Sequence, residues 1–239
     1  MGKLIVFTSS KGGAGGSVCA AGIATAAATL DKKTLIIDMA SKGRCLDTLF
    51  ATTAKTVFDF CDVANGKVEI SSAAVKCDIF ENLSVLASSV NDSKITDDGL
   101  INLINLAVNN YDYVFIDANW GVFLKINSLC TFAQFVIVTS PELIALKNVY
   151  EVSSNLQKLS NTKFILNFFD KKDKLCSSLD NIVDTCGVSL LGVVPKDKQV
   201  KICYDSCTPI IFGRASKAFM RIFSRLNSNF VSLPKINRI

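Results

Sequence analysis

Short runs of consecutive apolar residues recur along the chain, separated by longer segments with helical spacing. The apolar runs predict strands at residues 4–8, 33–38, 83–86, 113–117, 135–139, 163–167 and 189–194. Helical spacing or an Ala-rich composition predicts helices at residues 17–30, 99–109, 143–159, 179–186 and 215–226. Strands that are apolar throughout and alternate with helices indicate a mostly parallel sheet covered on both faces. We therefore expect a three-layer, doubly wound α/β fold.

The ends of the predicted strands carry most of the candidate chemistry. In doubly wound sheets, ligands bind beyond the carboxyl ends of the strands. We therefore expect the functional site just after the strand ends at Thr8, Asp38, Asp117, Thr139, Asn167 and Val194. Since no linker or internal repeat interrupts the 239 residues, the sequence predicts one domain over residues 1–239, with a tail at 227–239.

Composition and charge add only weak constraints. Hydrophobic residues make up 49% of the chain, enough for a sizeable core, and the net charge is +5. The basic runs at 171–174 and 196–201 favour solvated loops, with a DNA or anionic membrane surface as the weaker alternative. No apolar run reaches about 18 residues, so no transmembrane helix is expected.

Histidine is absent, which excludes histidine general acid–base chemistry, histidine-containing triads and histidine metal ligands. The nine cysteines are irregularly spaced, and the chain begins with a strand rather than a signal peptide pattern. Free thiols in a reducing cytoplasm are therefore expected. Cys203 and Cys207 lack the second pair that a zinc site would need.

Residues 9–17 read Ser-Ser-Lys-Gly-Gly-Ala-Gly-Gly-Ser and lie between the first predicted strand and the first predicted helix. Glycines allow backbone amides to converge on anionic oxygens, and a helix N-terminus adds a favourable dipole. The segment therefore predicts a phosphate-binding loop. A tight strand-to-helix turn without a ligand is the alternative.

The run from Lys11 to Gly15 resembles the deviant phosphate loop of the MinD/ParA ATPases, Lys-Gly-Gly-x-Gly-Lys-Ser/Thr. The resemblance implies a homodimer in which Lys11, the signature lysine, contacts the nucleotide of the partner subunit. It also implies that the final hydroxyl, Ser17, binds Mg²⁺. The implied ATP- or ADP-binding loop residues are Lys11, Gly12, Gly13, Ala14, Gly15, Gly16 and Ser17.

Later segments are similar to the same family in the same order, over residues 1 to about 226. Residues 114–117 are similar to its Walker B strand, and Asp38 matches the first acid of its Asp-x-Asp switch. The resemblance therefore assigns Mg²⁺ to Ser17, Asp38 and Asp117. It also implies that Asn167 contacts adenine, and that Pro195 and Asp197 line the base pocket.

Two residues depart from the family pattern. Gly16 stands where the second lysine of the loop belongs, and Ala40 stands where the water-positioning acid belongs. A charge-assisted contact contributes roughly 1.5–3 kcal/mol, so its loss could weaken nucleotide binding by about ten- to a hundredfold. Lys42, in the loop after the second strand, is a candidate surrogate for the missing lysine.

With these departures, the resemblance implies an ATP-binding protein that hydrolyses little and acts as a dimeric localisation or scaffolding factor in pilus, flagellar, division-site or partition positioning. We expect a cytoplasmic protein, recruited to a pole or membrane by an unknown partner of a positioning or secretion system. The alternatives are a working ATPase that uses Lys42, and a pseudo-ATPase that binds no nucleotide. The altered loop is also similar to the TadZ/CpaE branch. Members of that branch usually carry a receiver-like domain, which this sequence lacks, so the branch stays open.

Overall fold

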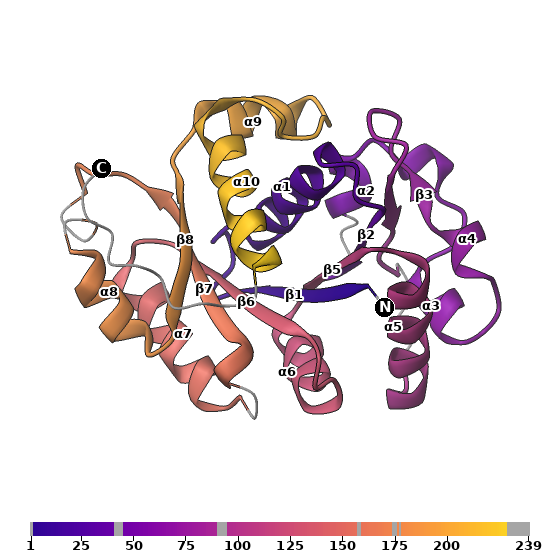
Figure 1. The fold of residues 1–239 in the computed structure, drawn as a ribbon, viewed down its shortest axis with the longest axis horizontal. Coiled ribbons are helices and arrows are strands. Elements are labelled where there is room, and N and C mark those ends of the chain that lie inside the picture. Colours follow the sequence, from indigo (N-terminus) through magenta and orange to yellow (C-terminus); the bar gives the residue numbers. More distant parts are fainter. Residues whose placement is uncertain are drawn as a thin grey trace.

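An eight-stranded sheet forms the centre of the molecule (Figure 1). The computed structural model describes residues 2–40, 45–89, 95–156, 159–173, 176 and 178–228. The strands are β1 (Lys3–Ser9), β2 (Thr34–Met39), β3 (Val75–Lys76), β4 (Leu83–Leu86), β5 (Tyr113–Ala118), β6 (Gln134–Thr139), β7 (Thr162–Phe169) and β8 (Ser189–Pro195). Their order is β3-β4-β2-β5-β1-β6-β7-β8, and only the β3–β4 pair is antiparallel. The predicted mostly parallel sheet is therefore confirmed.

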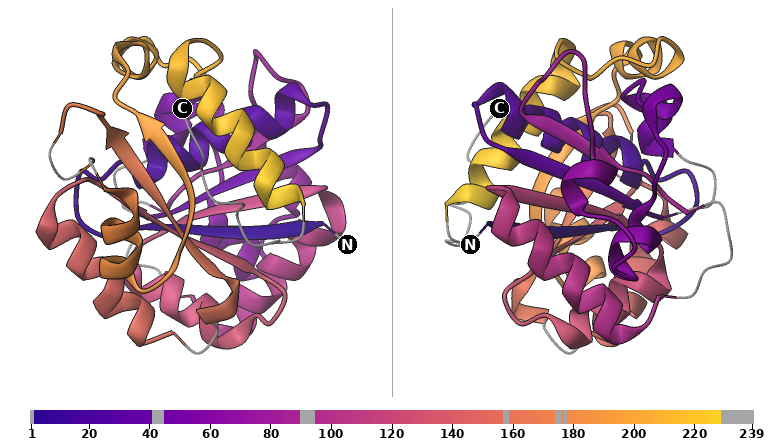
Figure 2. Two further views of the ribbon diagram at one scale, coloured as in Figure 1. Left: turned by 60° about the vertical axis from the view of Figure 1, so that its left-hand side comes forward. Right: turned by 90° about the vertical axis from the view of Figure 1, so that its right-hand side faces the viewer.

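Helices cover both faces of this sheet (Figures 1 and 2). The α-helices of the described residues are α1 (Gly16–Thr29), α2 (Cys45–Leu49), α3 (Phe60–Ala64), α4 (Ile70–Ala73), α5 (Asp97–Asn110), α6 (Trp120–Leu129), α7 (Leu143–Ser154), α8 (Leu179–Cys186), α9 (Lys198–Asp205) and α10 (Gly213–Asn227). One core cluster lies between the sheet and α1, α2 and α10, and the other lies under α3 to α8. The fold is therefore doubly wound, as the sequence predicts.

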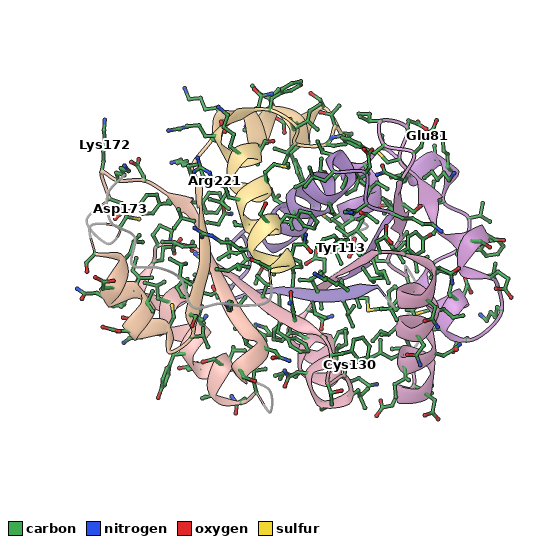
Figure 3. All side chains as sticks on the ribbon, in the orientation of Figure 1. Glu81, Tyr113, Cys130, Lys172, Asp173 and Arg221 are labelled. Carbon is green, nitrogen blue, oxygen red and sulfur yellow. The ribbon has the colours of Figure 1, made fainter. Side chains whose placement is uncertain are left out.

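Close packing of α10 on α1 and β5 fixes the helix layer on one face of the sheet. A Cβ on Gly22 would lie 2.3 Å from the Phe219 ring, so glycine is required where the two helices meet. Figure 3 marks Tyr113 near the end of α10, where its ring lies 4.9 Å from that of Phe223. The Tyr113 hydroxyl also donates a hydrogen bond of 2.7 Å to Asn227 Oδ1.

Several local predictions need correction. The helix predicted over 143–159 is too long, because α7 ends at Ser154. The Asn155 and Leu156 amides instead donate to the carbonyls of Val152 and Ser153, which closes tight turns in place of helical ones. The segments α2, α3, α4, β3, α6 and α9 were not predicted. Most of these are too short to display a helical or strand period.

Two chemical expectations concern the whole chain. No disulfide joins any of the nine cysteines, all of which lie in the described residues. No helix in that part of the chain combines the length and the apolar composition that crossing a bilayer requires.

Candidate functional site

The carboxyl ends of the central strands bring the sequence-predicted acids and the glycine-rich loop together. In the parallel register, Asp38 at the end of β2 pairs with Asp117 at the end of β5. Asp117 also pairs with Phe7 of β1, so the loop that follows β1 begins next to both acids. The register therefore brings these two acids and the start of the loop together at one edge of the sheet.

Residues 10–15 form an open loop between β1 and α1. Gly13 and Gly15 have positive φ angles of 78° and 89°, which residues other than glycine rarely adopt. The Ala14 amide donates to the Lys11 carbonyl over 3.3 Å, which closes the turn. A Cβ on Gly12 or Gly13 would meet no atom within 4 Å. The loop thus presents accessible backbone at the N-terminus of a helix, where anions are favoured.

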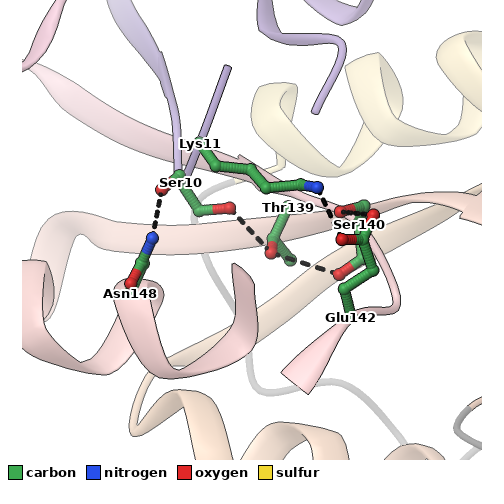
Figure 4. Close-up of polar contacts among 6 residues, drawn as sticks. All are labelled: Ser10, Lys11, Thr139, Ser140, Glu142 and Asn148. Atoms are coloured by element: carbon green, nitrogen blue, oxygen red, sulfur yellow. Dashed lines mark hydrogen bonds and ion pairs between the residues drawn. The ribbon is translucent and has the colours of Figure 1, made fainter. Parts of the chain in front are cut away.

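Hydrogen bonds hold the start of this loop against β6 and α7 (Figure 4). The Ser10 amide donates to the Val138 carbonyl over 2.8 Å, and the Ser10 hydroxyl donates to Thr139 Oγ1 over 2.9 Å. Asn148 Nδ2 donates to the Ser10 carbonyl over 2.9 Å. Because Ser10 is bonded through three groups, the base of the loop is fixed before any ligand binds.

Lys11 pairs with Glu142, at the start of α7, within the same chain (Figure 4). Lys11 Nζ lies 2.6 Å from Glu142 Oε2, and the Ser140 hydroxyl donates to Glu142 Oε1 over 3.3 Å. The hydrogen bond from Lys11 lowers the pKa of the Glu142 carboxyl. Both side chains are partly exposed, so solvent screens the pair and a stronger anion can compete for the lysine.

Gly16 is buried against the Ser9 side chain. Its amide donates to Ser9 Oγ over 3.1 Å, and a Cβ on Gly16 would lie 2.2 Å from that oxygen. A side chain at position 16 therefore requires the Ser9 hydroxyl to turn away and to give up this hydrogen bond. The sequence alone gave no reason to include Ser9 in the site.

Asp117 is the acid best suited to hold a cation. Its side chain is 2% exposed, and Oδ2 has no hydrogen-bond partner among the described residues. Burial raises the pKa of Asp117 to about 7, against a hydrogen bond with Ser17 that lowers it, and nearby Asp38 raises it further. A buried carboxylate oxygen without a partner, next to the Ser17 hydroxyl, fits the oxygen ligands that Mg²⁺ prefers.

Asp38 is already engaged with the segment that follows it. Its carboxylate accepts hydrogen bonds from the amides of Ala40, Cys45 and Leu46, at 3.2, 3.0 and 3.2 Å. Burial raises its pKa, although these amides lower it. Asp38 therefore shapes the chain around Ala40, which offers no carboxylate of its own. The candidate surrogate Lys42 lies outside the described residues.

Cys45 also lies in the site, although its sequence context alone does not identify it as a site residue. Its thiol hydrogen-bonds with Tyr204 and Ser17, so it links α2 and α9 to the start of α1. Burial raises the pKa of this thiol, and the charges of Asp38 and Asp117 raise it further. Its position in the switch-like segment after Asp38 was the available signal.

No group of three or more Cys, Asp or Glu residues that could hold a metal occurs in the described residues, Cys203 and Cys207 included.

The three residues predicted to surround a base lie at the ends of β7 and β8. Asn167 Nδ2 donates to the Ala14 carbonyl over 2.9 Å, so its amide nitrogen supports the loop. Pro195 ends β8 and pairs with Phe169. Asp197 caps α9 through the Gln199 amide at 3.0 Å and also accepts from the Ala215 amide at 2.9 Å.

Comparisons with known proteins agree with this fold. Residues 5–210 match the family model of the CobQ/CobB/MinD/ParA nucleotide binding domain. The septum site-determining protein MinD of Bacillus subtilis is 27% identical over 246 residues, covering 98% of this chain and 92% of that protein. A chain of the MinC:MinD cell division protein complex of Aquifex aeolicus superposes with a TM-score of 0.86 at 28% identity, covering 98% of both chains. MinD of Pyrococcus horikoshii, complexed with Mg-ADP, shares the fold with a TM-score of 0.80 at 23% identity, covering 95% of this chain and 97% of that one.

The raised pKa of Asp117 predicts a loss of stability with rising pH. In the unfolded chain the Asp117 carboxyl has its ordinary pKa of 3.8, whereas in the folded state its pKa is about 7. The folded state therefore binds the Asp117 proton more tightly than the unfolded state does. The contribution, on the order of 4 kcal/mol, is present below pH 4 and lost above pH 7. We expect Asp117→Asn to be more stable than the parent at pH 8 but not at pH 4.5, measured by urea unfolding. Asp184→Asn, the same charge change on the exposed surface, should follow the parent; parallel curves for all three proteins would contradict the assignment.

Proposed function

Because this chain belongs to the CobQ/CobB/MinD/ParA family of nucleotide-binding domains, we propose that it binds ATP or ADP with Mg²⁺ and acts as a dimeric localisation or scaffolding factor that hydrolyses little ATP. The chain would work as a single nucleotide-binding domain with a tail at 227–239. One observation carries the proposal. The loop between β1 and α1 keeps open backbone at a helix N-terminus, whereas Gly16 and Ala40 supply neither of the side chains that turnover needs.

The proposed nucleotide would lie along the loop from Lys11 to Ser17, with its phosphates facing the backbone amides. The accessible Gly12 and Gly13, next to the start of α1, support this position. Mg²⁺ would be held by Ser17, Asp38 and the unpartnered Oδ2 of Asp117, and when bound it would neutralise phosphate charge. Asp38 would at the same time hold the start of α2 through the amides of Cys45 and Leu46.

The proposed deficiency in turnover follows from two missing groups. Phosphoryl transfer needs positive charge at the transferring phosphate and a positioned water. Gly16 has no side chain to provide the first, and the methyl group of Ala40 cannot provide the second. Lys11 would supply charge across a dimer interface only after leaving Glu142.

Its partner would be a protein of a positioning or secretion system, in the cytoplasm and recruited to a pole or membrane. The relative from Aquifex aeolicus forms a cell division complex with MinC, which makes a protein partner the leading candidate over DNA or a lipid surface. The neighbouring genes, whether for pilus, flagellar, division or partition proteins, would identify the process. They would also test the TadZ/CpaE branch.

A pseudo-ATPase that binds no nucleotide is the second candidate. Three groups expected to face a ligand are bonded within the chain itself: Gly16 N to Ser9, Asn167 to Ala14, and Lys11 to Glu142. A protein that binds no ligand would satisfy these polar groups by hydrogen bonds within its own chain, as is observed for these three. The third candidate, an ATPase using Lys42, depends on a residue outside the described part of the chain.

Nucleotide binding separates these candidates. We expect isothermal titration of Mg-ATP into the parent protein to give a dissociation constant in the micromolar range or weaker, roughly −8 kcal/mol or less favourable. The loop amides provide the affinity that remains without a lysine at position 16. Absence of both heat and thermal shift at millimolar Mg-ATP would support the pseudo-ATPase.

Assembly tests the role of Lys11. We expect Mg-ATP to shift the protein toward a two-fold symmetric dimer in sedimentation velocity, and Lys11→Ala to abolish that shift. Glu142→Gln is the matched control, because it removes the partner charge while leaving the lysine free to reach a second subunit. Dimerisation of Lys11→Ala at the parental ATP concentration would rule out a role for Lys11 across the interface.

Turnover separates the scaffold from the working ATPase. We expect negligible phosphate release by the parent, because each missing group could lower the rate a hundredfold or more, on the order of 3 kcal/mol. Gly16→Lys combined with Ala40→Asp should raise turnover more than either change alone, since both act on one transition state. Adding Ser9→Gly should help further, because the Ser9 hydroxyl lies only 2.2 Å from the position of a Cβ on Gly16. ATP hydrolysis by the parent protein at a rate typical of the family would refute the proposed deficiency. Lys42→Ala would then test whether Lys42 replaces the missing lysine.

A further inference from the structure

The end of β7 contains an irregularity directly beside the phosphate loop. Leu166 pairs with Val193 of β8, whereas Phe169 pairs with Pro195. Two residues of β7, Asn167 and Phe168, thus face one residue of β8. Two residues opposite one define a β-bulge. Bulges change the direction in which side chains point and are common next to functional sites.

The bulge changes which side of the sheet Phe168 faces. Phe164 and Leu166 belong to the core under α7 and α8, so strict alternation would direct Phe168 into the same core. Phe169 packs against that core instead. Phe168 adopts a positive φ of 56°, a conformation that bulky side chains rarely adopt.

As a result, the Phe168 ring lies over the loop in solvent. Its ζ carbon is 3.7 Å from the position of a Cβ on Gly15, and the residue is 41% exposed. An exposed aromatic ring held at a rarely adopted backbone angle indicates a local function rather than core packing. The amide nitrogen of the neighbouring Asn167 is already bonded to the Ala14 carbonyl.

We propose that Phe168 is the stacking platform for the nucleotide base, so that the base is held mainly through its flat face. The inference rests on the proposed nucleotide binding and adds the residue that holds the base. Stacking on an aromatic ring does not distinguish one base edge from another, so the platform serves adenine and guanine alike. The phosphates depend on the loop amides and do not need this ring.

Isothermal titration with three probes tests the platform: Mg-ATP, Mg-GTP and inorganic tripolyphosphate with Mg²⁺. Phe168→Ala should weaken both nucleotides by about tenfold or more and leave tripolyphosphate unchanged, because stacking typically contributes that much per base. Phe168→Tyr, which keeps an aromatic ring at this position, should bind both nucleotides with the affinity of the parent protein. The matched control is Phe132→Ala, since Phe132 is 44% exposed at the opposite, amino-terminal edge of the sheet, between α6 and β6.

Each outcome decides the proposal. Unchanged ATP affinity in Phe168→Ala would overturn the platform while leaving the proposed nucleotide binding in place. Equal weakening of ATP and tripolyphosphate would also overturn it, because the ring would then support the loop rather than the base. Failure of the parent to bind ATP would overturn both. If Phe168→Ala does not fold, Phe168→Trp in a Trp120→Phe background gives a second measurement: the indole emission should be quenched by ATP but not by tripolyphosphate.

Discussion

Burial of β1 on both faces is the constraint on which the rest of this structure depends. Leu4 and Val6 belong to one core cluster, and Ile5 and Phe7 belong to the other. With no side chain of this stretch reaching solvent, polar chemistry can begin only where the strand ends. The neighbours β5 and β6 run parallel to β1 and end at the same edge, so the loop after β1 meets Asp117 on one side and Thr139 on the other.

This constraint explains why the central fold was predictable. Apolar runs that must be buried on both faces are visible in the sequence, and all seven predicted strands are present. The short elements between β2 and β4 left no such signal, because segments of two to five residues do not complete a period. The early end of α7 also depends on tight turns at Asn155 and Leu156 that no spacing rule specifies.

The candidate site was only partly predictable. The acids at strand ends and the glycines of the loop can be recognised in the sequence. The parallel register of β2 and β5 then brings the two acids together. The sequence could not reveal that Ser9 fills the space beside Gly16, or that the Cys45 thiol contacts Ser17, because both depend on tertiary contacts. Phe168 was hidden for another reason. An alternating pattern assigns it to the core, and only the bulge turns it toward the loop.

The central claim is that backbone amides, without a lysine at position 16, hold the phosphates of a bound nucleotide. Hydrogen–deuterium exchange of the amides of residues 12–17, with and without saturating Mg-ATP, tests it most directly. The account predicts slower exchange at these amides in the presence of Mg-ATP. It predicts no change at residues 109–112, where α5 ends at the opposite edge of the sheet. Identical exchange of residues 12–17 in both conditions would contradict the claim.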